Sequence, residues 1–561
     1  MVKNILYFFS QEQKGVHQAA FLLAISGILA DILALLRDRL LAAHFGASRT
    51  LDLYYVSFRV PDFVYTLSLF FAASTALIPI ILDKFKESDR KGEEFLSNIF
   101  SFFTFAVLAL VILAYFLMPH LISLAAPGFS GADRAQVILL SRILLLSPLF
   151  LGLSNLVSSV IQSFRRFYIY ALSPLLYNLG IIIGIIYLLP RYGISGIVWG
   201  VVIGAFLHLA VQLPSAISLG FKLRLNLPRF NDDMREALKL SAPRTLGLSL
   251  NQIVLTILTA IGSTLGVGAV SIFNLASNLQ SVPLTVIGLS YSVSAFPTLA
   301  ASFAKEDKKD FLKYFLLTLR HIVFWSLPAT VLFIVLRAQI VRVILGAGAF
   351  SWLDTRLTAA SLLLFSLSIL AQGLVYLLVR AFYAAGHTFL PVLINIIASV
   401  STIASAFWLL SLFNHSPAFQ SWFSGFLRVG DISQSAILIL PLAISLGSLI
   451  NVGLLLWHFR KIFGSFGDNV LSRSLRDTLT ASVFIGISVY LALKPLSMIL
   501  NLETFLGIFL QGFISGVLGL LLGGIILWRL GNQEFKELAE AFHSKVWSRV
   551  FVVASEPEKL P

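Results

Sequence analysis

The chain has 561 residues, of which 58% are hydrophobic and only 12% are charged, and its mean hydropathy is +0.89. This balance excludes the soluble globular classes and is typical of a polytopic membrane protein. The chain contains no cysteine, which excludes disulfides, thiolate metal sites and a cysteine nucleophile. Its formal net charge of +14 is better explained by basic cytoplasmic loops than by nucleic acid, so we expect no nucleic-acid partner.

Apolar stretches long enough to cross a bilayer as helices recur along the whole chain, each with about 20 residues. We predict an all-α polytopic membrane protein with about fourteen transmembrane helices. The predicted spans are 17–36, 53–82, 95–119, 136–162, 167–189, 193–219, 238–262, 268–303, 311–336, 357–384, 388–413, 435–457, 477–497 and 503–528. No small-residue cleavage site follows the first span, so we expect no cleaved signal peptide.

The distribution of Lys and Arg predicts how the chain lies in the membrane. With the N-terminus inside, most basic residues fall in inside loops such as 83–94, 222–239 and 458–477. The positive-inside rule therefore places both termini in the cytoplasm. The tail after Arg529 predicts a short amphipathic helix, and the external loop 414–434 carries aromatic clusters suited to the membrane surface.

Two stretches of the chain resemble each other weakly. Both 58–91 and 278–310 contain an early proline, a span rich in small residues, a late proline and then a charged inside loop. Six spans separate them, so the two halves keep the same topology. We predict two pseudo-symmetric six-helix lobes around a central cavity, with an N-terminal lobe at 1–220, a C-terminal lobe at 221–460 and a terminal helix pair with a cytoplasmic tail at 461–561.

Charged residues within the predicted spans mark candidate functional positions. Asp31 lies inside the first span, and the run Arg37-Asp38-Arg39 follows it closely. Each such charge costs about 2.5–3.5 kcal/mol at the centre of a bilayer, so these side chains are expected to face a bundle interior or a wet cavity. A buried salt-bridge cluster that only fixes helix packing is the alternative interpretation.

The next group of polar residues is also open to two interpretations. Arg59 and Asp62 are three residues apart, so they share a helix face and could simply neutralise each other. Arg244 and Asn278 lie in or beside later spans. Asn side chains within spans often join helices by hydrogen bonds rather than bind ligands.

Several motifs together resemble the MurJ/MviN family of lipid II flippases, part of the multidrug/oligosaccharidyl-lipid/polysaccharide exporter superfamily. They occur in the family's order between residues 20 and 400. The matching stretches are 37-RDRLLAAHFGASRTLDLYYVSFRVPDF-63, 125-AAPGF-129 with 140-LSRILLLSPLF-150, 162-QSFRRFYIYALSPLLYN-178, 242-APRTLGLSLNQI-253 with 287-IGLSYSVSAFPTL-299, 348-GAFSWLDTRLTAASL-362 and 382-FYAAGHTFLPV-392.

The resemblance implies a function and a location. Members of this family move an undecaprenyl-pyrophosphate-linked peptidoglycan precursor across the bacterial inner membrane by alternating access of two lobes. The implied partners are the lipid-linked precursor, membrane lipids and a proton or monovalent cation, since an ion gradient or the membrane potential would drive transport. The resemblance implies no cofactor. It places a cationic cavity around the pyrophosphate, for which arginine is a suitable bidentate donor.

The match is incomplete at the cationic cavity. Arg37 aligns with a cavity arginine of the family, whereas Asp31, Tyr65, Asn278 and Ala347 stand where the family has arginines. We therefore expect substrate binding from a reduced set and ion coupling or charge pairing from two carboxylates. The expected substrate-binding residues are Arg37, Arg59, Arg39, Arg244 and Asn278, and the expected carboxylates are Asp31 and Asp62.

Three alternatives keep the membrane location but change the function. The same fold could export another lipid-linked saccharide or exchange an amphiphile for an ion, and the missing arginines favour this. A non-transporting scaffold for cell-wall assembly is a further possibility. A membrane transferase would need clustered carboxylates for a metal, and the adjacent pair Asp232-Asp233 is expected instead to precede and cap the next helix. We predict a non-enzyme without catalytic or metal-binding residues, and no Walker motif indicates ATP hydrolysis.

Overall fold

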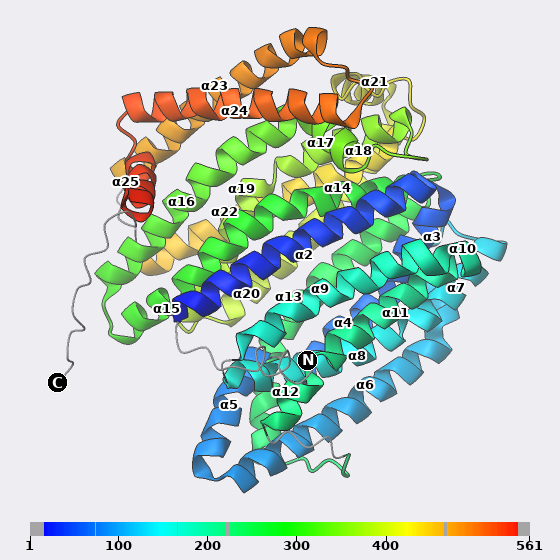
Figure 1. Ribbon diagram of the computed structural model, residues 1–561, viewed down its shortest axis with the longest axis vertical. Coiled ribbons are helices and arrows are strands. Elements are labelled where there is room, and N and C mark those ends of the chain that lie inside the picture. The colour runs from blue at the N-terminus through cyan, green and yellow to red at the C-terminus, as the bar shows by residue number, and fades with distance from the viewer. Residues whose placement is uncertain (1–15, 73, 165, 220–224, 465–467, 548–561) are drawn as a thin grey trace. The chain divides into compact units, whose positions relative to one another are not determined.

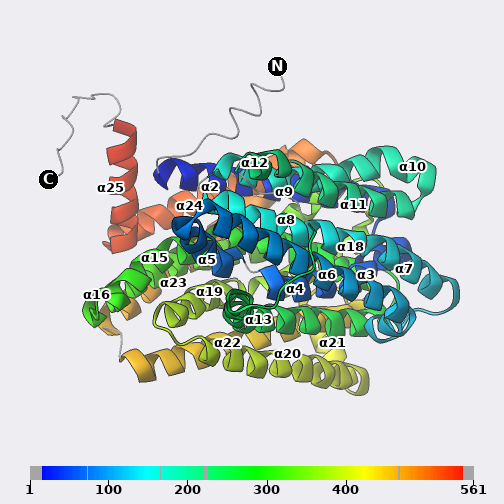
Figure 2. The ribbon, with the colours of Figure 1, turned by 90° about the horizontal axis from the view of Figure 1, so that it is seen from below.

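The computed structural model describes residues 16–72, 74–164, 166–219, 225–464 and 468–547, and within these residues every regular element is a helix. The all-α prediction is confirmed. Residues cluster into two compact units, which we describe separately (Figures 1 and 2). The first unit contains the described residues of 1–282, 344–365 and 388–451, and the second contains those of 283–343, 366–387 and 452–561.

The helices of the first half of the chain all belong to the first unit. In chain order these are α2 Val16–Phe45, α3 Arg49–Ser57, α4 Arg59–Ala72, α5 Ser74–Glu87, α6 Asp89–Ala125, α7 Gly131–Leu144, α8 Leu146–Ser163, α9 Phe167–Ile183, the π-helical turn η1 Gly184–Leu188, α10 Leu189–Tyr192, α11 Ile194–Ala210, α12 Leu213–Ser218, α13 Asp232–Ser263 and α14 Ala269–Pro283.

The remaining helices belong partly to the first unit and partly to the second. They are the π-helical turn η2 Leu284–Leu289, α15 Ser290–Ala304, α16 Lys308–Val335, α17 Arg337–Ile344, α18 Trp352–Ser366, α19 Ile369–Ala384, α20 Phe389–His415, α21 Pro417–Phe426, the 3-10 turn η3 Ser435–Leu438, α22 Ile439–Phe463, α23 Asp468–Ile499, α24 Phe505–Arg529 and α25 Gln533–Trp547.

Most of the predicted spans are present as helices. Within the described residues, eleven helices are long and apolar enough to cross a membrane, and counting α18 with α19 as one span gives twelve. The other two predicted spans are more complex. Span 17–36 lies in the 30-residue helix α2, and span 53–82 is divided among α3, α4 and α5, each of 14 residues or fewer. These two spans remain predictions.

Three further predictions concern the tail after Arg529, the loop 414–434 and the Asp232-Asp233 pair. The tail helix is confirmed as α25, and loop 414–434 contains the short helix α21. Asp232 is the first residue of α13, but its N-cap is Asn231, whose side chain accepts a hydrogen bond from the Met234 amide at 3.1 Å. The prediction that the Asp232-Asp233 pair precedes and caps the helix is therefore wrong, because both residues lie in the first turn of α13 and the capping side chain is that of Asn231.

A stripe of glycines brings α9 and α11 into backbone contact in the first unit. Gly200 and Gly204 of α11 face Gly180 and Gly184 of α9 and η1. A Cβ atom on Gly200 would lie 2.6 Å from the Cα of Gly184, which is too close for any side chain. In a membrane, where helix association depends on close packing, such stripes let two helices approach directly. Figure 1 shows α9 between α11 and α2.

Each unit has its own apolar packing. In the first unit, Phe103 of α6 and Val160 of α8 belong to a fully buried cluster. In the second unit, α23 packs along both α16 and α24, with Phe324, Ala481 and Leu527 at the contact (Figure 1). Both views show α25 turning away from the axis of α24. The terminal helix pair is thus α23 and α24, and α25 follows it.

Candidate substrate-binding site

Arg37 and Asp38 form an ion pair in the second half of α2. Arg37 Nη2 lies 2.8 Å from Asp38 Oδ1, and Arg37 Nε donates to the same oxygen at 2.9 Å. Arg37 Nη1 also donates to Asn178 Oδ1 of α9 at 3.3 Å. Asp38 is only 2% exposed. The Arg37 side chain is 20% exposed, so the pair is only partly buried, and loss of Arg37 would leave a buried carboxylate without its cation.

Asn278 of α14 completes the environment of Asp38. Its Nδ2 donates to Asp38 Oδ2 at 2.8 Å, so both carboxylate oxygens of Asp38 are engaged. The predicted substrate ligand Asn278 therefore contacts a protein carboxylate, 240 residues earlier in the chain. Asp38 is not among the site residues predicted from the sequence, although its position between two arginines in one charged run indicates a paired carboxylate.

Arg59, the first residue of α4, is buried with incomplete hydrogen bonding. Its side chain is only 6% exposed, and its Nη2 donates to Asn274 Oδ1 of α14 at 2.6 Å. The Arg59 Nε atom has no hydrogen-bond partner within the described residues. A buried cation with an unused N–H group is costly, and an anionic ligand is the natural acceptor for it.

Asp62 and Tyr65 lie further along α4. Asp62 accepts a hydrogen bond from Gln252 of α13, and among the described residues it has no ion pair with Arg59 within 4.0 Å. The Tyr65 hydroxyl accepts a hydrogen bond from Asn155 Nδ2 of α8 at 2.7 Å. Tyr65 is therefore part of a neutral hydrogen-bonded contact at a position where the family resemblance suggested arginine.

The other predicted site residues lie elsewhere. Asp31 is partly buried on α2, and in the described part of the chain it has no hydrogen bond or ion pair. Arg39 Nη1 donates to the carbonyl of Ile344, the last residue of α17, at 3.3 Å. Arg244 lies on α13, but its side chain is outside the described residues. The structure thus brings Arg37 and Asn278 together through Asp38. Arg59 of α4 contacts the same helix as Asn278, α14, through its hydrogen bond to Asn274.

Asp52 of α3 is a further buried carboxylate, which the sequence analysis did not select. It is fully buried, and its oxygens accept hydrogen bonds from the Gly268 amide at 2.6 Å, the Ser271 amide at 2.8 Å and the Ser271 hydroxyl at 2.7 Å. These donors surround the N-terminus of α14, where a negative charge is favourable. Gly268 has a φ of 82°, and a Cβ there would lie 2.1 Å from the Ala47 carbonyl oxygen, so only glycine fits.

Asp354 makes a similar contact nearby in the same unit. Its Oδ2 accepts hydrogen bonds from the Ala47 amide at 3.3 Å and the Ser351 amide at 2.9 Å. The Ala349 amide also donates to the Ala43 carbonyl at 2.8 Å. The first and fifth motifs of the family resemblance therefore pack against each other, although about 300 residues separate them.

The described residues contain no group of three or more His, Asp or Glu side chains arranged to hold a metal ion. The cluster presents guanidinium groups, the donors that bind anions in proteins. The half-buried Arg37 and the buried Arg59 lie on helices that both hydrogen-bond to α14, and Arg59 has a donor without a partner among the described residues.

Comparison with known proteins decides the family. A family model described as lipid II flippase MurJ matches residues 41–509. This chain belongs to the lipid II flippase MurJ family. A probable lipid II flippase MurJ from Buchnera aphidicola (strain APS) is 31% identical over 369 residues, covering 65% of this chain and 72% of the relative. The lipid II flippase MurJ of Burkholderia cenocepacia is 26% identical over 408 residues, covering 70% and 79%.

Solved structures show the same fold. A lipid II flippase MurJ in an inward closed conformation aligns with a TM-score of 0.73 and 24% identity, covering 91% of this chain and 99% of that one. An inward-facing MATE family transporter of the MOP superfamily aligns with a TM-score of 0.60 and 13% identity, covering 81% and 99%. The predicted resemblance to the MurJ family is confirmed, as are the polytopic helical fold and the membership of a transporter family rather than an enzyme family.

Proposed function

We propose that this chain is a flippase that translocates lipid II, a polyprenyl-pyrophosphate-linked peptidoglycan precursor, across the bacterial inner membrane by alternating access. Membership of the MurJ family supports this function. The observation that carries the site is the buried guanidinium group of Arg59 on α4, which keeps an unused donor among the described residues, together with the half-buried guanidinium group of Arg37 on α2. A pyrophosphate entering a low-dielectric space needs such donors.

Arg37 and Arg59 are the principal pyrophosphate contacts in this proposal. Arg39, Arg244 and Asn278 are secondary candidates, and Asp31 and Asp62 are the proposed charge partners or ion-coupling groups. Asp31 is suited to binding a proton or monovalent cation because it is partly buried on α2 and, among the described residues, has no partner. An intramembrane carboxylate of this kind is a functional candidate by default.

The hydrogen bonds to α14 suggest how the lobes alternate. We assign α2, α3 and α4 to the N-terminal lobe at 1–220 and α14 to the C-terminal lobe at 221–460, with the terminal pair at 461–561. Asp38, Asp52 and Arg59 each bind α14, so these bonds hold the two lobes together. Both termini lie in the cytoplasm in this arrangement, and these bonds break when the cavity opens outward. Released Arg59 and Arg37 then exchange protein partners for the substrate.

The test is rescue of bacteria whose own lipid II flippase is shut off. We expect the wild-type chain to restore outward exposure of lipid II, and Arg37→Ala to abolish it. Because Arg37→Ala leaves the Asp38 carboxylate without its cation, a second variant, Arg37→Gln with Asp38→Asn, removes both charges and keeps polar side chains at both positions. Arg356→Ala is the matched control, because it removes an arginine that pairs with Asp431 on the surface.

The outcome is read at equal protein levels in the membrane. Loss of exposed lipid II in both Arg37 variants, with activity kept in Arg356→Ala, supports the proposed site. Well-expressed wild-type protein that exposes no lipid II would overturn the proposed function, and full activity of both Arg37 variants would overturn the site.

A further inference from the structure

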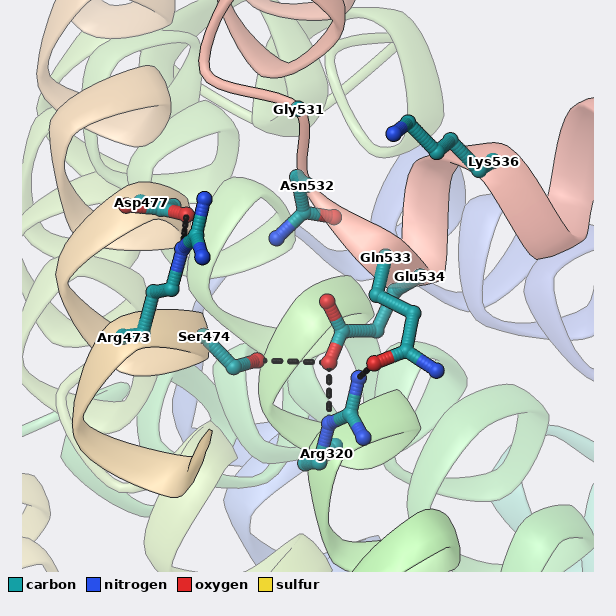
Figure 3. A pocket seen from close by; sticks show the side chains of 9 residues that line it. All are labelled: Arg320, Arg473, Ser474, Asp477, Gly531, Asn532, Gln533, Glu534 and Lys536. Atoms are coloured by element: carbon teal, nitrogen blue, oxygen red, sulfur yellow. Dashed lines mark hydrogen bonds and ion pairs between the residues drawn. The ribbon is translucent and has the colours of Figure 1, made fainter. Parts of the chain in front are cut away.

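The second unit contains a pocket with side chains of both charges. It has a volume of ≈ 480 Å³ and lies where the end of α24 meets α25, beside α16 and α23 (Figure 3). Its charged lining comprises Arg320, Arg473, Asp477, Glu534 and Lys536. Three cations and two anions give a nearly balanced site, which does not match a purely anionic or purely cationic ligand.

Glu534 of α25 presents an unpaired carboxylate oxygen at this pocket. Its Oε1 accepts hydrogen bonds from Arg320 Nε at 2.5 Å and from Ser474 Oγ at 2.7 Å. Its Oε2 is buried and has no hydrogen-bond partner within the described residues. Figure 3 shows the second oxygen turned away from Arg320, toward the side of the pocket where Asn532 lies. A buried acceptor left without a donor is costly, so this oxygen indicates a ligand with N–H or O–H groups.

The charge on Glu534 persists at neutral pH. Burial raises the pKa of this carboxyl, but the hydrogen bonds from Arg320 and Ser474 outweigh burial and hold the pKa below its ordinary value. A cationic donor therefore meets an ionised carboxylate.

The pocket also presents cations that are accessible to an anion. The Arg473 side chain is 66% exposed and touches Asp477 only at 3.9 Å. Lys536 is exposed and makes no ion pair in the described part of the chain. The N-terminus of the 15-residue helix α25 opens toward the same pocket and adds a partial positive charge.

The pocket lies at the ends of two membrane spans. The candidate spans Leu471–Ile499 and Phe505–Arg529 begin and end beside its lining residues. Just beyond it, Leu479 and Val483 of α23 and Trp528 of α24 are exposed apolar side chains. A ligand in the pocket can thus keep its polar part among charges and its apolar chains along α23 and α24.

We propose that this pocket binds the headgroup of a phospholipid that carries a primary ammonium beside its phosphate, as phosphatidylethanolamine does. The phosphate contacts Arg473 and Lys536, and the ammonium donates hydrogen bonds to Glu534 Oε2 and to Asp477. Basic pockets at the ends of transmembrane helices are known to bind lipid headgroups, and the paired carboxylates here add selectivity for the ammonium.

The test measures lipid binding to the full-length, delipidated protein by native mass spectrometry. Phosphatidylethanolamine, phosphatidylcholine and phosphatidylglycerol with identical acyl chains are the probes. Phosphatidylcholine has the same charges but no N–H donor, so we expect it to bind about tenfold more weakly, the effect of one charge-assisted hydrogen bond. Equal binding of the first two lipids, or tighter binding of phosphatidylglycerol, would overturn the proposal.

Two variants separate the phosphate contact from the ammonium contact. Lys536→Ala should weaken both zwitterionic lipids, whereas Glu534→Gln should remove the preference for phosphatidylethanolamine and keep the binding of phosphatidylcholine. Retained phosphatidylcholine binding also shows that the pocket of Glu534→Gln is folded. Lys461→Ala, which removes an exposed lysine at the end of α22, is the matched control. Unchanged binding of both zwitterionic lipids to Lys536→Ala, together with an unchanged preference for phosphatidylethanolamine in Glu534→Gln, would overturn the proposed site.

Discussion

The first unit buries a cation with an unused donor, whereas the second buries a carboxylate with an unused acceptor. Arg59 gives Nη2 to Asn274 but leaves Nε without a partner, and Glu534 gives Oε1 to Arg320 and Ser474 but leaves Oε2 without one. Neither atom has a hydrogen-bond partner among the residues that the structure describes. One unpaired atom is a donor on a cation and the other is an acceptor on an anion. The two sites therefore suit opposite ligand groups, an anion in the first unit and a hydrogen-bond-donating cation in the second.

A fully paired carboxylate gives the reference for both sites. Asp52 accepts three hydrogen bonds and binds only protein groups, so its role is structural. We expect Asp52→Ala to destabilise the fold by about 3 kcal/mol or more, because several buried donors lose their acceptor. Thermal unfolding in detergent measures this. A melting temperature equal to that of the wild type would show that the Asp52 contacts contribute little to stability. Asp52 would then not serve as the fully paired reference for Arg59 and Glu534.

The pH dependence of hydrogen exchange in α25 tests the role assigned to Glu534 in the second unit. Because the folded pKa of Glu534 lies below the ordinary value of 4.5, its contribution to stability is fully present above that value and is lost as pH falls through the folded pKa. We expect hydrogen exchange in α25 to rise below about pH 4.5 in the wild type. In Glu534→Gln, exchange should already be faster at pH 7 and should change less with pH.

The smallest effect is expected for the partly exposed pair Arg356–Asp431. Its atoms approach to 2.6 Å, and the hydrogen bond from Arg356 lowers the pKa of Asp431, but the Asp431 side chain is 66% exposed. Exposed pairs contribute little because water and salt screen them. We expect Arg356→Ala to leave the melting temperature nearly unchanged at high and low salt. A large fall in the melting temperature would contradict this expectation, because it would show that an exposed pair stabilises the fold as much as a buried one.

The sequence predicted the fold and part of the site. Apolar length predicted the helices that, within the described residues, are long and apolar enough to cross a membrane, eleven of them or twelve with the bent pair α18 and α19. The charged run directly after the first predicted span indicated Arg37, because such a charge needs a wet or paired environment. Asp52, Asn274 and the partnership of Asp38 with Asn278 were not predicted. Their significance depends on partners more than 200 residues away, which no local pattern reveals. The same holds for Arg320 and Glu534, which lie 214 residues apart.

Tyr65 and Asn278 stand at positions where the family resemblance implies arginine, and the structure explains both residues. Asn278 and Tyr65 both hydrogen-bond within the protein, Asn278 to Asp38 and Tyr65 to Asn155. An arginine at position 278 would add a formal ion pair with Asp38, where the asparagine supplies a neutral donor. The chain therefore keeps the contact at this point with one charge fewer.

The central claim is that the unused donor of Arg59 serves the substrate. The most direct test compares wild type with Arg59→Met for outward exposure of lipid II in flippase-depleted cells, together with the melting temperature of each purified protein. Replacing a buried cation by an apolar side chain of similar volume is often neutral for stability. We predict that Arg59→Met keeps its melting temperature within about 2 °C of the wild type and loses outward lipid II. Full restoration of outward lipid II by Arg59→Met would contradict the account.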